Sequence, residues 1–170
     1  MPPSIALWVY ELDVPLAALF LIYAALHDIA TRTIPDTIPV VLVVLGLTLR
    51  LVEGNLLPAL LAATLFAICL GFCWWRGWLG GGDVKLLVAL AILLPPSRVL
   101  PAIEAIAWSG VVLALPYWAL RRRLAAPSPR RPAAFLARIW RVERFRLRRG
   151  GPLPYGLAIA AGGLLELFGR

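Results

Sequence analysis

The feature that most constrains the fold is a run of 22 residues without a charge, residues 54–75. About 20 apolar residues in a helix cross the hydrocarbon core of a bilayer. The chain is 61% hydrophobic and 15% charged, whereas soluble domains are about half apolar and about a quarter charged. The sequence therefore predicts an all-α integral membrane protein, a single domain over residues 1–170. We expect about six transmembrane helices, over residues 14–26, 37–49, 54–75, 84–94, 99–120 and 152–168.

The distribution of basic residues predicts how these helices are oriented. Of the 17 Lys+Arg, 14 fall in three connections on one side of a six-helix arrangement, residues 27–36, 76–85 and 121–151. Basic loops favour the cytoplasmic side, so we expect an inner (cytoplasmic) membrane protein with its N-terminus outside. The first residues lack the basic region of a signal peptide, and we expect them to be retained.

The basic loop 121–151 holds 11 of the 17 Lys+Arg. Beside apolar helices, such a loop favours contact with anionic lipid headgroups over a nucleic-acid site. Its portion 135–147 is expected to form an amphipathic interfacial helix. Nucleic acid is therefore not a predicted partner, and lipid is.

Two carboxylates stand at the edges of apolar segments on the predicted cytoplasmic side. Asp28 follows the first segment, and Asp83 follows three glycines, residues 80–82, directly before the fourth. A carboxylate at the end of an apolar helix is costly to place, which indicates a function. One span more or fewer between these acids would move them to opposite faces, so their common side favours a catalytic pair.

Two adjacent carboxyl groups cannot both ionise cheaply, so one keeps its proton. The ionised group can take a proton from water that attacks a peptide carbonyl, and the protonated group can donate to the carbonyl oxygen. The chain has one histidine and two cysteines, Cys69 and Cys73, which lie one helical turn apart in an apolar run and suit packing. We expect no metal and no other cofactor.

Each acid also has a structural explanation. Asp83 could cap the next helix, and Asp28 could be a solvated helix-end carboxylate paired with Arg32. Asp36 lies on the same side and could replace Asp28 as the partner, but it follows Pro35 and fits a helix cap. A small membrane transporter or assembly subunit with a proton relay through both acids is the alternative function, although a relay favours acids in mid-membrane.

The three glycines allow unusual backbone angles, a close approach of a substrate strand, or a hinge. Lys85 lies two residues beyond Asp83 and therefore faces another side of the helix. There it could neutralise a substrate group or extend toward the lipid headgroups.

Three segments resemble the motifs of one family. Residues 28–36, Asp-Ile-Ala-Thr-Arg-Thr-Ile-Pro-Asp, resemble its pattern Asp-x-x-x-Arg-x-Ile-Pro-Asn. Residues 80–87 resemble its Gly-x-Gly-Asp-x-Lys motif, and residues 154–160 resemble its Pro-Tyr-Gly signature. The three segments occur in the family's order and extend along nearly the whole chain. The chain therefore resembles the type IV prepilin (leader) peptidases, which are intramembrane aspartic proteases of the GxGD type. Asp36 is the departure, because asparagine is usual there.

The resemblance implies that Asp28 and Asp83 are the catalytic pair of an aspartic endopeptidase that removes a basic leader from prepilin-like substrates at the cytoplasmic face. It implies a supporting role for Gly80, Gly82, Lys85, Arg32, Pro35, Pro154, Tyr155 and Gly156. Residues 29–36 are too short for the extra region of methylating members, so the chain resembles the peptidase-only form of tight-adherence (Flp) pilus systems, without N-methyltransferase activity. The particular pilin and the oligomeric state are not predicted.

Overall fold

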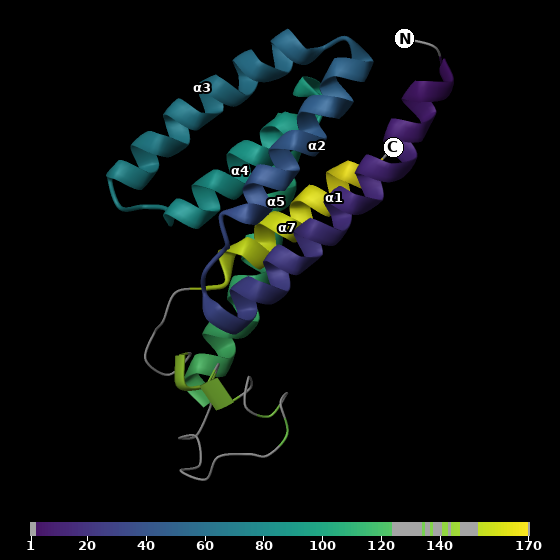
Figure 1. The fold of residues 1–170 in the computed structure, drawn as a ribbon. Coiled ribbons are helices and arrows are strands. Elements are labelled where there is room, and N and C mark those ends of the chain that lie inside the picture. Colours follow the sequence, from purple (N-terminus) through teal and green to yellow (C-terminus); the bar gives the residue numbers. More distant parts are fainter. Residues whose placement is uncertain are drawn as a thin grey trace.

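The computed structural model describes residues 3–123, 134, 137, 141–142, 144–146 and 153–169. Across this part of the chain there are helices and no strand, which confirms the all-α fold (Figure 1). The principal helices are α1 (Pro3–Thr31), α2 (Thr37–Glu53), α3 (Leu56–Trp75), α4 (Gly81–Leu93), α5 (Pro96–Arg123) and α7 (Tyr155–Phe168). Most of the basic loop 121–151, with its expected lipid contact and interfacial helix, lies outside the described residues.

Among the residues that the structure describes, three helices are long and apolar enough to cross a membrane, over Ala6–Thr31, Leu56–Trp75 and Pro96–Leu120, and α7 is a shorter apolar helix. A row of large apolar side chains on α3 points away from the bundle: Leu57, Leu61, Leu65 and Ile68. Such a row is unfavourable in water but is solvated by lipid tails. The protein is therefore a polytopic membrane bundle.

The short helix α4 lies inside the bundle. It packs against α2 and α3 and also contacts α5 and α7, while α1 packs against both α2 and α7. At 13 residues, α4 is only about 20 Å long, too short to cross the hydrocarbon core alone. Seven of its side chains are buried, as expected for a short helix sheltered by its neighbours.

Helix α1 corrects the expected span over residues 14–26. It has 29 residues, runs through Glu11, Asp13 and Pro15, and continues past Asp28. Glu11 is exposed, and Asp13 accepts a hydrogen bond from the Thr48 hydroxyl. Charged side chains outside the apolar core do not interrupt a helix, because the helical backbone bonds to itself. Asp28 therefore lies within the last turn of α1 and does not simply follow it.

Two glycines allow close contact between helices. A Cβ atom on Gly46 in α2 would lie 2.7 Å from the Leu93 amide nitrogen of α4. A Cβ atom on Gly162 in α7 would lie 2.5 Å from the Ile106 amide nitrogen of α5. Small residues at such crossings let helix backbones approach in membranes. These contacts set the positions of α4 and α7, both of which contribute to the site described next.

Candidate active site

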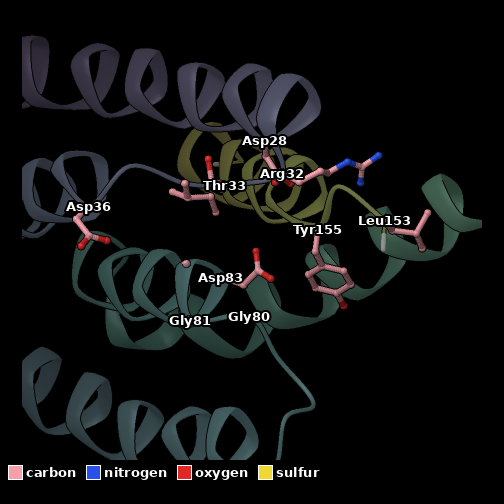
Figure 2. Close-up of a pocket in the computed structure, with 11 residues that line it drawn as sticks. Asp28, Arg32, Thr33, Asp36, Gly80, Gly81, Asp83, Leu153 and Tyr155 are labelled. Carbon is pink, nitrogen blue, oxygen red and sulfur yellow. The ribbon is translucent and has the colours of Figure 1, made fainter. Parts of the chain in front are cut away.

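A pocket of about 450 Å³ lies at one end of the bundle, where the C-terminal end of α1 meets the N-terminal ends of α2, α4 and α7. Asp28 and Asp83 both line it, and Figure 2 shows the Asp83 carboxylate directed toward the part of α1 that carries Asp28. The structure thus brings together the two acids that the sequence placed on one side. The described residues that line it are Asp28, Arg32, Thr33, Ile34, Asp36, Gly80, Gly81, Gly82, Asp83, Leu153 and Tyr155.

The Asp28 side chain is 5% exposed and is held by α7. The Gly156 amide donates a hydrogen bond to Asp28 Oδ2 over 2.8 Å. A Cβ atom on Gly156 would lie only 2.9 Å from the same oxygen, so the residue at this position must be small. Both the donor and the space for the carboxylate therefore come from the start of α7.

Asp83 lies in the first turn of α4, outside the three helices that are long enough to span a membrane. The alternative interpretation of Asp83 as a helix cap is wrong, because Gly80 occupies the N-cap position and Asp83 is already helical. Burial and, secondly, the neighbouring Asp28 carboxylate raise the pKa of Asp83 to about 6, against a smaller opposing effect of the Gly80 amide hydrogen bond. Asp83 therefore exchanges its proton closer to neutral pH than an ordinary aspartate does.

The glycines 80–82 do not supply unusual backbone angles, which corrects that interpretation. Gly80 is extended, with φ −71° and ψ 144°, and the next two glycines already belong to α4. They supply space instead. A Cβ atom on Gly80 would lie 3.0 Å from Asp83 Oδ2, and one on Gly82 would lie 3.3 Å from Ile34 Cβ. Side chains here would crowd the pocket wall and the Asp83 carboxylate.

Arg32 directly follows α1 and lines the pocket. It has φ 61°, a left-handed conformation that costs a non-glycine residue about 1 kcal/mol. Its guanidinium lies 6.0 Å from the ring centre of Tyr117 in α5. Nearby, Arg146 donates hydrogen bonds to the carbonyls of Ile29 (3.2 Å) and Ala30 (3.3 Å), which a helix end leaves without helical partners. A residue of the basic loop thus contacts the helix end that carries Asp28.

Lys85 does not line the pocket but reaches its edge. Its Nζ atom lies 2.7 Å from Asp36 Oδ1, and both side chains are exposed. Asp36 stands at the N-cap position of α2, as expected, but its side chain makes no capping hydrogen bond and pairs with Lys85 instead. Asp36 does line the same pocket as the two other acids. Pro35 is absent from the lining and accepts the Ile38 amide hydrogen bond at the start of α2 (3.1 Å).

The remaining expected residues come from the start of α7. Pro154 is buried at the N-cap position, and Tyr155 lines the pocket with its side chain 37% exposed. The Tyr155 hydroxyl lies against Gly110 of α5, 3.7 Å from where a Cβ atom would be. The Tyr155 side chain therefore lies between the pocket and α5.

Three lining residues were not singled out from the sequence: Thr33, Ile34 and Leu153. The first two lie inside a motif-like segment, so proximity to Arg32 was an available signal. No signal in the sequence pointed to Leu153. None pointed to the distant Arg146 either, because an arginine in an Arg-rich stretch does not differ from its neighbours. Among the residues with described positions, no group of three or more His, Cys, Asp or Glu could hold a metal ion.

Comparison with known proteins gives one match. The model of the type IV leader peptidase family matches residues 16–118. This region contains Asp28 and Asp83 and ends before α7, so the Pro154-Tyr155-Gly156 segment lies outside it. No curated protein and no solved structure matches the chain.

Proposed function

This chain belongs to the type IV leader peptidase family, and from that membership we propose that it is an aspartic endopeptidase with Asp28 and Asp83 as its catalytic pair. Family membership supports a peptidase in general. The observation that carries the aspartic mechanism is the presence of two carboxylates, from α1 and α4, in one pocket. A pocket of about 450 Å³ is within the usual range for bound ligands.

The environments of the two acids suggest different roles. Asp28 already accepts the Gly156 amide and suits the ionised base, whereas Asp83, with a pKa of about 6, suits the protonated acid. Asp28 takes a proton from water as the water oxygen bonds to the scissile carbonyl carbon. Asp83 gives its proton to the carbonyl oxygen, which forms a neutral tetrahedral diol.

Collapse of this diol restores both groups. The proton on Asp28 passes to the amide nitrogen as the C–N bond breaks, and one diol hydroxyl returns a proton to Asp83. The products are a carboxylic acid and a free amine, and the two carboxyls regain their starting states. General acid–base steps of this kind contribute about 10²–10⁴-fold each.

For the substrate, we propose the basic leader of a prepilin-like protein, cut at the cytoplasmic face. The charge distribution along the sequence supports this face, because 14 of the 17 Lys+Arg belong to the three segments predicted to be cytoplasmic, and two of these segments, 27–36 and 76–85, contribute residues to the pocket. Exposed Trp74, Trp75 and Trp78 follow one another near the same end, as in an interfacial aromatic belt. The connection from α1 to α2 covers only residues 32–36, which supports the Flp-type, peptidase-only form.

The test is cleavage of a co-expressed prepilin by Asp28→Asn and Asp83→Asn variants. We expect each variant to accumulate in the membrane and to cut at least about 100-fold more slowly, as loss of a general acid or base implies. Asp13→Asn is the matched control, since Asp13 also lies in α1 but contacts Thr48 away from the pocket. Normal processing by either of the first two variants would exclude the paired mechanism. The position of both acids in a pocket at one end does not favour the alternative proton relay.

A further inference from the structure

A second pocket, here called the outer pocket, lies at the other end of the bundle. It has a volume of about 180 Å³ and is bordered by the N-terminal half of α1, the C-terminal ends of α2, α4 and α7, and the start of α5. The two pockets share four helices, α1, α2, α4 and α7. Each of these helices borders the active-site pocket near one end and the outer pocket toward its other end. Tyr10 here and Asp28 there are separated along α1 by about 27 Å, close to the hydrocarbon thickness of a bilayer.

The outer pocket contains a buried guanidinium with an unused donor. The Arg50 side chain is 2% exposed, and its Nη1 atom pairs with Glu53. Its Nε atom has no hydrogen-bond partner within the described parts of the chain. A buried charged donor without an acceptor is costly, so this atom indicates that an acceptor belongs in or beside the pocket.

Two further charged groups of the lining are available for a ligand. Arg98 donates one Nη1 hydrogen bond to the Glu166 carbonyl over 2.7 Å, which leaves its other donors. Glu166 also lines the pocket, and its carboxylate forms no ion pair with another residue whose position is described. The lining thus offers donors for an anion and one carboxylate for a cation.

The rest of the lining is apolar, including Val14, Leu49 and Leu167. Exposed Trp8 and Tyr10 lie near the same end of α1, and such aromatic residues mark the level of the lipid headgroups. The complementary ligand therefore has a phosphate-like anion, a nearby ammonium and an apolar part. A purely anionic ligand fits less well, because Glu53 and Glu166 would repel it.

We propose that the outer pocket binds the zwitterionic phosphoethanolamine headgroup of a membrane phospholipid. The phosphate lies between Arg50 and Arg98, the ammonium contacts Glu166, and the glycerol end covers the apolar lining. This site is independent of the proposed proteolysis, since it lies at the other face of the bundle and contains no residue of the active-site pocket.

The experiment measures lipids retained by the full chain after purification in detergent, by native mass spectrometry. We expect phosphatidylethanolamine to be retained over phosphatidylglycerol with the same acyl chains. Arg98→Gln and Glu166→Gln should each lower phosphatidylethanolamine retention about tenfold, as loss of one charge-assisted hydrogen bond implies. Matched controls are Arg76→Gln and Glu104→Gln, which lie outside the outer pocket and should retain the lipid normally.

Three outcomes would overturn the proposal. Equal retention of phosphatidylglycerol would indicate an anion site only, and equal competition by water-soluble glycerophosphoethanolamine would indicate a soluble ligand. Unchanged retention in both pocket variants would exclude the site. If either variant fails to fold, Leu167→Trp fills the pocket without removing a charge and must also lower retention.

Discussion

The Gly156 amide at the start of α7 donates a 2.8 Å hydrogen bond to the Asp28 carboxylate in the last turn of α1. These residues are 128 positions apart in the chain, yet each restricts the position or the size of the other. Asp28 takes its orientation from this donor, and Gly156 has no room for a side chain because the carboxylate occupies it. This contact gives the Pro-Tyr-Gly segment a physical connection to the proposed catalytic pair.

Replacing Gly156 by alanine is therefore expected to impair cleavage far more than folding. The added Cβ would lie 2.9 Å from Asp28 Oδ2, so the carboxylate must move from its position opposite Asp83. A displacement of about 1 Å costs about 100-fold in rate, which a prepilin cleavage assay measures. The matched control is Gly71→Ala in α3, where no atom lies within 4 Å of the added Cβ. Equal activity of the two variants would contradict the prediction.

The rate of cleavage should fall as the pH rises through about 6. The pKa of Asp83 is raised from 3.8 to about 6, so the proposed acid is protonated below this range and loses its proton above it. Because the protonated form is the active one, kcat/KM should decline toward tenfold for each pH unit on the alkaline side. The measurement is kcat/KM from pH 5 to 8 in detergent, with Asp36→Asn as a control that keeps the same midpoint. A rate that stays level across this range would exclude Asp83 as the acid.

Replacing Gly162 by alanine is expected to destabilise the bundle. Its Cβ would lie 2.5 Å from the Ile106 amide nitrogen, and a backbone atom cannot move away as a flexible side chain can. We expect the free energy of unfolding in detergent to fall by about 1–3 kcal/mol. Gly71→Ala should instead leave it unchanged or raise it by up to about 1 kcal/mol, because alanine favours a helix. A loss of the same size in both variants would show that the α5–α7 contact is not the cause.

The ion pair between Lys85 and Asp36 is expected to contribute little to stability. Its two side chains are 54% and 73% exposed, so water screens the attraction. A double-mutant cycle with Lys85→Gln and Asp36→Asn should give a coupling energy below about 1 kcal/mol. The cycle is measured by unfolding in detergent at low and high salt. A larger coupling that persists in high salt would mean that the pair is less accessible to water than its exposure indicates.

The sequence predicted the apolar helices well because lipid selects for long charge-free runs, a property of neighbouring residues. It was less successful at helix ends. The first span was expected to begin at residue 14, after Glu11 and Asp13, but α1 passes through both, since an exposed charge near a membrane edge does not break backbone hydrogen bonds. Asp83 was open to interpretation as a cap, but Gly80 occupies that position. From the sequence alone, it is hard to tell whether a residue is the N-cap of a helix or lies three positions beyond the N-cap, because the difference depends on the backbone conformation.

What the sequence by itself determined is the membrane bundle, the family resemblance and the common end of Asp28 and Asp83. The last follows from counting spans, because each crossing changes the side of the membrane. Only the tertiary structure decided that Gly156 holds Asp28, that glycines 80–82 provide space without unusual backbone angles, and that Arg50, Arg98 and Glu166 surround a second pocket. These features depend on contacts between residues far apart in the chain, and local patterns of charge and hydrophobicity do not encode such contacts.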